Sequence, residues 1–391
     1  MKKKTIKAGI AGAGFAAAFH CQAMKRVYCA DVVLEGLYST GATRLAAFAE
    51  KEGVRAYDSL DALLDRVDVL HICTPSHTHE AMAVAALKRD AFAIVEKPLT
   101  GFFGDGSETY RGDTYPKQRA LAAAQASIDR IVAAEEKSKG RVLYAENWVY
   151  APSIQKEREI LEKTAAQILW MHGEESHSGS HSPSYGYWKY AGGGSMMSKG
   201  CHPLTAALYL KQVEGRVRNR KPIRPATVSA HTHALTRSDA FKDEGLIRAD
   251  YYDIEDFSTM HVVFEDGTVA DIMASDIVLG GVHNWLEVNT TNHRTVCNIN
   301  PNTAMQTFNP VEGNFKDIEV VEKIETKLGW ASTSPDEDWF TGYPQEIEAF
   351  YGTVAHGLPI ESNLSLAADC IRTIYSAYVS ADEEGKRVVI A

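Results

Sequence analysis

The sequence predicts a two-domain protein, in which an α/β domain built on a parallel sheet precedes an α+β domain built on a large, mostly antiparallel open sheet. Three observations lead to this prediction. The chain has 391 residues, more than one ordinary hydrophobic core accommodates. Short apolar runs alternate with helical segments in the first part of the chain, as in parallel sheets whose strands are joined by helices. Strand-like runs with period-two alternation and a hairpin turn dominate the middle of the chain.

The first predicted element is a strand that starts at Ile6 and enters the turn Gly12-x-Gly14-x-x-Ala17. A turn this tight needs a positive φ, which glycine adopts without steric cost. Gly14 allows a pyrophosphate to approach the backbone, and Ala17 allows the next helix to pack closely on the strand. The free N–H groups at the start of that helix favour a phosphate. We therefore predict a Rossmann dinucleotide-binding domain. The residues of this turn that we expect at the cofactor are Gly12, Gly14, Phe15 and Ala16.

Strands and helices alternate through the rest of this domain. The predicted strands are 31–38, 67–73, 91–95 and 142–146, and the predicted helices are 16–27, 42–52, 58–64, 80–89 and 117–138. The loop 101–116 is rich in glycine, tyrosine and acidic residues and has no periodicity, which is typical of a functional lid or a disordered segment. We place the domain boundary near Asn147, which gives domains of residues 1–147 and 148–391.

The end of the second strand bears on the choice of cofactor. A dinucleotide site usually places an acid there for the ribose hydroxyls, or a base for a 2′-phosphate. This chain offers Ser39 and Thr40 and then Arg44, with no acid among them. The predicted cofactor is therefore NAD or NADP, and we expect these three residues near it.

Two later turns each follow a predicted buried strand and therefore lie at one edge of the parallel sheet. One begins at Thr74, and the other is Glu96-Lys97-Pro98. Open α/β sheets bind ligands at the carboxyl ends of their strands. Lys97 is held there between an acid and a proline, which favours a catalytic lysine over an ordinary surface lysine. The residues of these turns that we expect at the cofactor are Thr74, Pro75, His79, Glu96 and Lys97.

The second domain is predicted to place helices on one face of its sheet. The predicted helices are 153–163, 199–211, 343–356 and 364–383, and the predicted strands are 167–174, 227–235, 258–264, 269–275, 285–290, 295–299 and 388–390. The pair Asp266-Gly267 between two of these strands is a strong hairpin signal.

Three consecutive glycines, 192–194, precede a helix start that carries Lys199 and His202. Residues three apart share one face of a helix, so both side chains could enter one pocket. If Lys97 lay there too, two lysines about 4 Å apart would repel each other by about 4 kcal/mol and lower the pKa of one of them from about 10.4 towards about 7.5. The neutral amine would then be available as a base. We predict Lys97, Lys199 and His202 as the catalytic group.

A loop rich in histidine, serine, glycine and tyrosine precedes the three glycines. Such a loop suits hydrogen bonding to a sugar, and its aromatic side chains suit stacking on a pyranose ring. Its histidines and carboxylates match no zinc spacing, so we predict no metal site. The histidines and carboxylates considered as metal ligands are His172, Glu174, Glu175, His177 and His181. The residues that we expect at the substrate are Trp148, His177, His181, Tyr185 and Trp188.

Composition excludes several classes of partner. The formal net charge of -10 and the lack of basic clusters argue against nucleic acid and anionic membranes. No run is long and apolar enough to span a bilayer. Six scattered cysteines without a C-x-x-C pair favour a reducing compartment, so we predict a cytoplasmic protein. The start of the chain up to Cys21 also resembles a secretory signal, but glycines interrupt it and cleavage would remove the first strand.

Taken together, these motifs resemble the glucose-fructose oxidoreductase, inositol dehydrogenase and MocA family (Gfo/Idh/MocA) over essentially the whole chain. The motifs are Gly12-x-Gly14-x-x-Ala17, Thr74-Pro75-Ser76 with His79, Glu96-Lys97-Pro98, Gly192-Gly193-Gly194 and His202. The resemblance implies that Lys97 and His202 line the active site beside a nicotinamide, and that the protein is a homodimer or homotetramer joined through its C-terminal sheet.

Two departures from the family pattern concern the catalytic group. Many members carry an aspartate where this chain has Ser198, so Lys199 becomes a candidate partner for proton transfer. An arginine that often follows the last strand of the first domain is also missing, and Trp148 stands in that region.

The function that this resemblance implies is an NAD(P)-dependent oxidoreductase that takes a hydride from a secondary alcohol of a sugar, glycoside or polyol. An alternative is an NAD-dependent glycoside hydrolase that works by transient C3 oxidation, elimination, water addition and re-reduction. A third reading is a regulator that senses nicotinamide without catalysis, which the presence of both Lys97 and His202 disfavours. The expected partner is a small carbohydrate.

Overall fold

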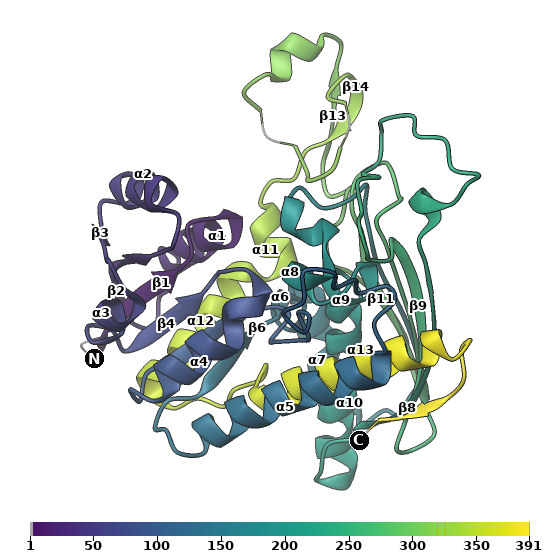
Figure 1. The fold of residues 1–391 in the computed structure, drawn as a ribbon, viewed down its shortest axis with the longest axis horizontal. Coiled ribbons are helices and arrows are strands. Elements are labelled where there is room, and N and C mark those ends of the chain that lie inside the picture. Colours follow the sequence, from purple (N-terminus) through teal and green to yellow (C-terminus); the bar gives the residue numbers. More distant parts are fainter. Residues whose placement is uncertain (1–2, 319, 325, 391) are drawn as a thin grey trace.

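The computed structural model describes residues 3–318, 320–324 and 326–390. Within these residues the strands form a six-stranded sheet, a seven-stranded sheet and a small two-stranded one (Figure 1). The first sheet is parallel throughout, and the second is antiparallel except for one pair of strands. The predicted fold class is therefore confirmed.

The N-terminal sheet has the strand order β3-β2-β1-β4-β5-β6. Its strands are β1 (Thr5–Ala11), β2 (Asp31–Tyr38), β3 (Arg55–Ala56), β4 (Val69–Ile72), β5 (Phe92–Glu96) and β6 (Val142–Ala145). Its helices are α1 (Phe15–Met24), α2 (Ala42–Glu52), α3 (Leu60–Leu64), α4 (His79–Leu87) and α5 (Lys117–Glu135). Every residue of β4 and β6 is buried, as expected for parallel strands covered on both faces. The strand order reverses between β1 and β4, and this is where such sheets bind dinucleotides.

The C-terminal sheet has the order β12-β11-β7-β10-β9-β8-β15, with β7 and β10 as its parallel pair. Its strands are β7 (Ile168–Ser176), β8 (Pro225–His233), β9 (Phe257–Phe264), β10 (Val269–Ser275), β11 (His283–Thr290), β12 (Arg294–Asn298) and β15 (Val388–Val389). Burial alternates along β9, as expected for a sheet with one covered face. Figure 1 shows the helices of this domain gathered on one side of the sheet.

The helices of the second domain include one that differs from prediction. They are α6 (Asn147–Tyr150), α7 (Pro152–Thr164), α8 (Trp188–Ala191), α9 (Ser195–Ser198), α10 (Cys201–Asn219), α11 (Glu337–Thr341), α12 (Tyr343–His356) and α13 (Leu364–Asp382), with short 3-10 turns η2 (Pro183–Gly186), η3 (Leu235–Arg237) and η4 (Glu312–Phe315). A further 3-10 turn, η1 (Ser76–Thr78), lies in the first domain before α4. The predicted helix 199–211 was wrong at both ends. Lys199 lies between α9 and α10, and α10 continues through Gly215, where a Cβ would come within 2.5 Å of the Lys221 carbonyl oxygen.

A projecting segment, of which the structure describes residues 300–318, 320–324 and 326–336, had no predicted element. It carries the hairpin β13 (Gln306–Asn309) and β14 (Gly329–Ser332) and rises above the rest of the molecule in Figure 1. Its tip exposes several large apolar side chains. They are Met305, Phe308, Val311, Ile318, Leu328 and Trp330.

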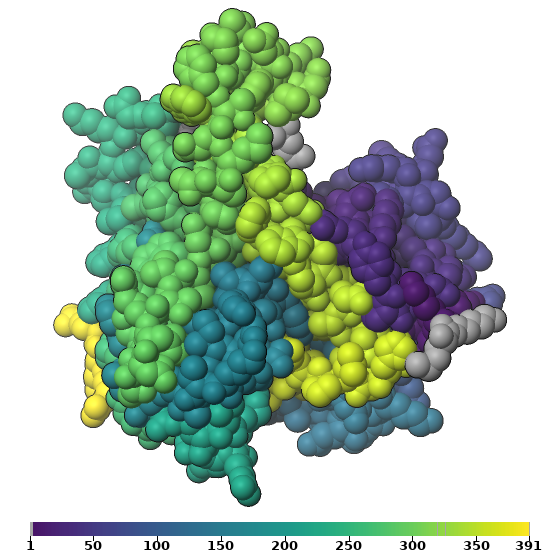
Figure 2. Space-filling view, turned by 180° about the vertical axis from the view of Figure 1, so that it is seen from behind, coloured from purple at the N-terminus to yellow at the C-terminus, as the bar shows by residue number. Residues whose placement is uncertain are grey.

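The last two long helices return to the N-terminal half. Helix α12 packs against α1, and α13 packs against α5. In Figure 2 the yellow-green segment that includes α12 lies between the purple N-terminal strands and helices and the teal and green C-terminal part. The predicted boundary at Asn147 follows β6 directly, but the first domain is completed by contacts from the end of the chain. No helix among the described residues combines the length and apolar character that crossing a membrane requires.

Candidate active site

The turn after β1 has the geometry of a phosphate cradle. Gly12 has φ 122°, and a Cβ there would lie 2.4 Å from the Cys73 carbonyl oxygen. A Cβ on Gly14, in contrast, would have no described neighbour within 4 Å. Phe15, the first residue of α1, is 70% exposed. The backbone N–H groups at the start of α1 are therefore approachable, and the turn fits a dinucleotide.

The end of β2 leaves the choice of nucleotide open. The Ser39 hydroxyl accepts a hydrogen bond from the Gly41 N–H, at 3.4 Å. Arg44 is exposed in the first turn of α2. Its guanidinium is therefore available to a 2′-phosphate, while the serine is available to a ribose hydroxyl.

Two residues predicted at the cofactor point into the protein instead. The ring nitrogens of His79 contact the carbonyl oxygens of Pro98 (2.8 Å) and Thr74 (2.9 Å), so this buried ring holds the two turns together. Glu96 is also buried, and its Oε1 lies 2.9 Å from Nε2 of His20. Both side chains support the cradle from behind. Sequence position at a strand end does not reveal which way a side chain points, and the placement of both residues at the cofactor stays a prediction.

Lys97 joins the two halves of the site. Its Nζ donates to the carbonyl oxygen of Ser198, at 2.9 Å, immediately before Lys199. The charges of Lys97 and Lys199 act on Glu175, and Nε2 of His202 lies 3.8 Å from its Oε2, so the predicted catalytic group surrounds one carboxyl. Residues from both domains thus meet at the edge of the parallel sheet.

The expected lowering of the lysine pKa is wrong. Burial opposes the charge of Lys97, but the groups around it outweigh burial and raise its pKa above the ordinary value. These groups are Tyr185, Cys201, Glu175 and Glu96. The expected repulsion is offset because Lys199 is paired with a carboxylate. Lys97 is therefore an ammonium group at neutral pH.

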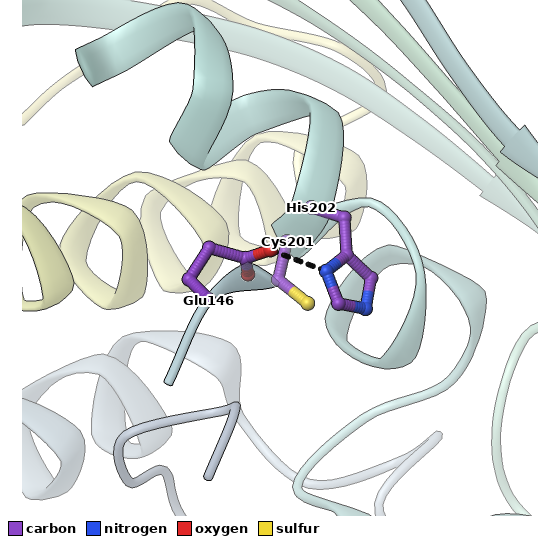
Figure 3. A group of neighbouring side chains, drawn as sticks. All are labelled: Glu146, Cys201 and His202. Atoms are coloured by element: carbon purple, nitrogen blue, oxygen red, sulfur yellow. Dashed lines mark hydrogen bonds and ion pairs between the residues drawn. The ribbon is translucent and has the colours of Figure 1, made fainter. Parts of the chain in front are cut away.

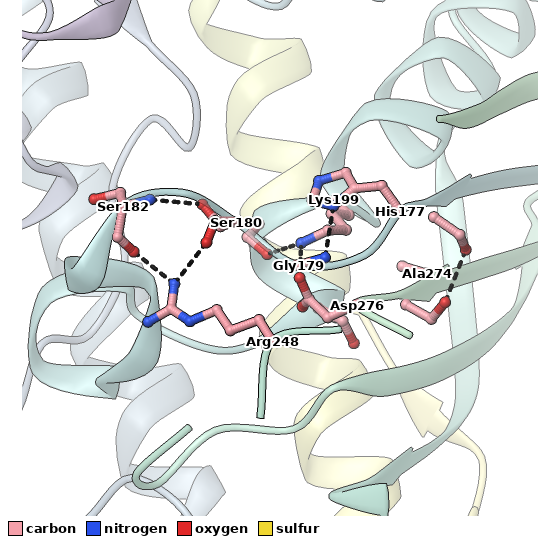
Figure 4. Close-up of polar contacts among 12 residues, drawn as sticks. His177, Gly179, Ser180, Ser182, Lys199, Arg248, Ala274 and Asp276 are labelled. Carbon is pink, nitrogen blue, oxygen red and sulfur yellow. Dashed lines mark hydrogen bonds and ion pairs between the residues drawn. The ribbon is translucent and has the colours of Figure 1, made fainter. Parts of the chain in front are cut away.

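The partner of Lys199 is Asp276, which directly follows β10. The Lys199 Nζ and Asp276 Oδ1 are 2.5 Å apart, and both side chains are 3% exposed (Figure 4). An acid at the end of a predicted strand is the signal that could have identified Asp276 from the sequence. Its pairing could not be foreseen, because the two residues come from distant segments.

His202 is held by Glu146, which the sequence analysis did not select. Its Nδ1 lies 2.5 Å from Oε1 of Glu146, at the end of β6 (Figure 3). The carboxylate accepts the Nδ1 hydrogen, so Nε2 carries the lone pair. Nε2 faces Oε2 of Glu175 at 3.8 Å, and the ring of Trp148 lies almost parallel to the imidazole, with centroids 5.9 Å apart. The pair has the geometry of a base and the group that orients it.

Glu146, Cys201 and His202 also bring three potential metal-ligand atoms within 4.8 Å of one another. Burial raises the pKa of the Cys201 thiol well above its ordinary value, which disfavours the thiolate that a metal would need. Glu146 and His202 are in direct hydrogen-bond contact, which an ion between them would break. The histidines and acids of the loop do not gather either, because Glu174 and Glu175 are successive residues of β7 and point to opposite faces.

The five residues predicted at the substrate lie in three places, and one of them, His181, lines the pocket described below. Trp148, His177 and Tyr185 lie at the predicted catalytic group. Trp148 stacks on His202, and Tyr185 acts on the charge of Lys97. Burial, and to a smaller extent the charge of Lys199, lower the pKa of His177 well below its ordinary value. Trp188 does not reach it. Its indole is buried against Tyr378, and its N–H donates to the Phe102 carbonyl at 2.9 Å. Trp188 instead fastens the loop 101–116.

A pocket of about 480 Å³ adjoins His177. Its lining residues are Ser178, Gly179, Ser180, His181, Pro183, Arg248, Asp250, Lys323 and Ile324. Arg248 donates to the carbonyl oxygens of Ser180 (2.9 Å) and Ser182 (2.7 Å), which fixes the loop (Figure 4). Lys323, from the projecting segment, donates to the Gly179 carbonyl. The pocket combines polar groups with apolar surface and has the size of a small-ligand site.

Two protein-family models match the chain. One, described as an oxidoreductase family with an NAD-binding Rossmann fold, matches residues 6–111, and the other, described as a GFO/IDH/MocA C-terminal domain, matches residues 156–295.

Curated relatives match shorter stretches. The UDP-N-acetylglucosamine 3-dehydrogenase of Acidithiobacillus ferrooxidans is 37% identical over 95 residues, which are 24% of this chain and 29% of that protein. The match therefore spans less than a third of that relative. The dTDP-3,4-didehydro-2,6-dideoxy-alpha-D-glucose 3-reductase of Streptomyces antibioticus is 26% identical over 235 residues, 56% of this chain and 64% of that protein.

Solved structures resemble the whole chain. GenD2 from gentamicin A biosynthesis, in complex with NAD, has a TM-score of 0.79 and 20% identity, covering 100% of this chain and 98% of that chain. A myo-inositol 2-dehydrogenase from Lactobacillus plantarum has a TM-score of 0.72 and 16% identity, covering 99% and 100%. At these identities the likeness establishes the shared fold.

Proposed function

Because the chain belongs to the Gfo/Idh/MocA oxidoreductase family, we propose that it is an NAD(P)-dependent dehydrogenase that removes a hydride from a secondary alcohol of a sugar, glycoside or polyol. The observation that carries this proposal is the hydrogen bond from the Lys97 ammonium to the Ser198 carbonyl. It joins the edge of the dinucleotide sheet to the segment that bears Lys199 and His202. Relatives named for oxidation of sugars and inositols support the substrate class.

Of the three predicted catalytic residues, His202 is best placed to take the hydroxyl proton. Its Nε2 has a lone pair, and Glu146 stabilises the imidazolium that forms. Lys97 is already charged, so its role is to donate a hydrogen bond to the developing alkoxide. A nicotinamide held through the turn at Gly12 supplies the hydride acceptor.

Lys199 has a different role in this scheme. Its ion pair with Asp276 keeps a buried charge next to Ser198, the residue whose carbonyl receives Lys97. We propose that Lys199 holds the turn between α9 and α10 in place and donates hydrogen bonds to substrate hydroxyls. The loop from His177 to Tyr185 and the adjoining pocket then bind the rest of the carbohydrate.

To test this proposal, a panel of sugars, polyols and glycosides is incubated with NAD or NADP, and turnover is measured from the absorbance of the reduced cofactor. Lys97→Ala and His202→Ala should each lower kcat by about 10³-fold, while cofactor affinity stays within about twofold, because the missing group acts on the proton or the alkoxide. Lys139→Ala, whose side chain is 91% exposed, is the matched control and should behave as wild type. Full turnover in Lys97→Ala would refute the assignment.

One observation favours the redox-neutral glycosidase as a second candidate. The Oε2 of Glu175 has no hydrogen-bond partner among the described residues, and burial raises the pKa of this carboxyl. A protonated Glu175 could donate to a departing aglycone oxygen. Release of an aglycone without net NADH would favour this function over the dehydrogenase, and cofactor binding without any turnover would favour a sensor.

A further inference from the structure

A chain of buried polar groups runs behind Lys97 and has no role in the scheme above. Its members come from four elements: Tyr351 from α12, His71 from β4, His20 from α1 and Glu96 from the end of β5. Successive contacts measure 2.9 Å from Tyr351 Oη to His71 Nε2, 2.8 Å from His71 Nδ1 to His20 Nδ1, and 2.9 Å from His20 Nε2 to Glu96 Oε1. Three of these side chains are 0% exposed, and Glu96 is 9% exposed.

Counting hydrogens gives this chain a direction. Each contact needs one hydrogen, and an ionised Glu96 contributes none, so Nε2–H of His20 donates to it. A neutral imidazole has one N–H, so Nδ1 of His20 must accept from Nδ1–H of His71. Nε2 of His71 is then an acceptor, and the Tyr351 hydroxyl donates to it. Every donor therefore points towards Glu96.

The opposite arrangement would need a charged His20. The hydrogen of Tyr351 would then turn to Sδ of Met24, 3.4 Å away, and exchange a nitrogen acceptor for a weak sulfur acceptor. It would also bury an extra charge. Burial lowers the pKa of His71 well below its ordinary value, which agrees with a neutral imidazole at this position.

Glu96 passes the effect of the chain to Lys97. Its second oxygen, Oε2, accepts the Lys97 backbone N–H at 3.1 Å. Burial alone would raise the pKa of Glu96, but the hydrogen bond from His20 and the charge of Lys97 lower it. The other titratable groups that act on Glu96 come from the end of β4, α4, β6, the loop that contains Tyr185, and α12. They are Cys73, His79, Tyr144, Tyr185, Tyr343 and Glu346.

We propose that His20, His71 and Tyr351 are positioning residues for Lys97, because their one-way hydrogen-bond chain keeps Glu96 an accepting carboxylate beside that lysine. The catalytic part of this proposal rests on the function proposed above. The direction of the chain does not, and it can be measured in the resting protein.

The first experiment reads the tautomers directly. Long-range ¹H–¹⁵N NMR of protein labelled with ¹⁵N-histidine should show His20 as the Nε2–H form and His71 as the Nδ1–H form, both neutral between about pH 6 and 8. Signals are assigned by their loss in His20→Gln and His71→Gln. A charged His20, or an Nε2–H form of His71 in the wild type, would overturn the proposed direction.

The second experiment follows Glu96 itself. Protonated Glu96 gives an infrared carbonyl band, which is assigned by its loss in Glu96→Gln. The pH at which this band develops should be about one unit higher in Tyr351→Phe than in wild type. His20→Leu, which cannot donate, should shift it further. His20→Gln keeps an amide N–H for Glu96 and should titrate close to wild type. Equal titration in all four proteins would show that the chain does not hold the carboxylate.

The third experiment connects the chain to catalysis. With any substrate that the panel identifies, the acid limb of the kcat/KM profile should move up by about one pH unit in Tyr351→Phe, with NAD affinity within about twofold. An unmoved limb in both Tyr351→Phe and His20→Leu would refute the positioning role. Absence of turnover in the wild type would count against the proposed function, and the NMR and infrared results would still decide the direction of the chain.

Discussion

The two halves of the active site are built in different ways. On the cofactor side the surface is mostly backbone and small residues, and the polar side chains His79 and Glu96 face inward as supports. On the substrate side the surface consists of charged side chains, and each predicted catalytic residue has a partner from another segment, such as Glu146 for His202. The cofactor half therefore depends on local chain geometry, whereas the substrate half depends on long-range charge pairing.

The same contrast appears in two buried carboxyls. Glu96, in the cofactor half, has a histidine and a lysine beside it, which lower its pKa in spite of burial. Glu255, in the substrate half, accepts from the N–H groups of Gly194 and Met196 and from the Tyr378 hydroxyl, all of them neutral. Burial outweighs these donors and raises the pKa of Glu255 to about 7. Neutral donors thus hold a carboxyl in place without keeping it charged at neutral pH.

The largest predicted effect is a loss of stability and of NAD binding caused by a substitution in the cofactor half. Gly12→Ala forces an alanine to φ 122° and puts its Cβ 2.4 Å from a carbonyl oxygen. We expect the free energy of unfolding to fall by about 4 kcal/mol, measured by urea denaturation, with loss of NAD binding.

Gly14→Ala is the matched control for that variant. Its backbone (φ -111°, ψ -161°) suits alanine, and the new Cβ would meet no described atom within 4 Å. It should unfold like wild type but bind NAD about tenfold more weakly, because the methyl group stands where a pyrophosphate approaches. Equal stability of the two variants would contradict the local-geometry argument.

The next effect concerns the pH dependence of stability in the substrate half. The Glu255 carboxyl titrates near 4.5 when unfolded and near 7 when folded, so folding takes up a proton between these values. The stabilisation is complete below pH 4.5 and is lost as the pH rises through 7. Relative to Glu255→Gln, the wild-type free energy of unfolding should therefore fall by about 3 kcal/mol from pH 4.5 to pH 7.5. Parallel pH curves for the two proteins would rule out this titration.

The smallest predicted effect is a change in nucleotide affinity in the cofactor half. Arg44 is an exposed cation beside the expected ribose position. Arg44→Ala should weaken NADP binding about fivefold, in line with one exposed charge interaction, and leave NAD binding within about twofold. Calorimetric titration of both nucleotides checks this. A similar loss for both would place Arg44 away from the 2′-phosphate.

Sequence patterns predicted most of the fold because they are local. The Gly12 turn, the apolar runs of the parallel sheet and the Asp266-Gly267 hairpin each report a backbone geometry within a few residues. The errors have local causes as well. The predicted helix 199–211 ended too early, because α10 continues through Gly215, where the chain from Lys221 packs too closely for a Cβ. The projecting segment lacks any strong periodicity, so its hairpin was missed.

The candidate catalytic residues were selected from the sequence, and their partners were not. Lys97 and His202 stand at recognisable positions after a strand and at a helix start. The carboxylates around them and around Lys199, which are Glu146, Glu175 and Asp276, come from separate segments whose proximity only the fold determines. The expected neutral lysine was wrong for this reason. The assignment of catalytic and substrate roles stays a prediction until the variants are measured.

The loop that Arg248 ties down has a consequence for affinity. The guanidinium donates hydrogen bonds to the carbonyl oxygens of Ser180, Ser182 and Pro183 and to the carboxylate of Asp250. A segment already confined before a ligand arrives loses little conformational entropy on association. Removing these hydrogen bonds would leave the groups that can contact a ligand unchanged and would weaken ligand binding through disorder of the free protein.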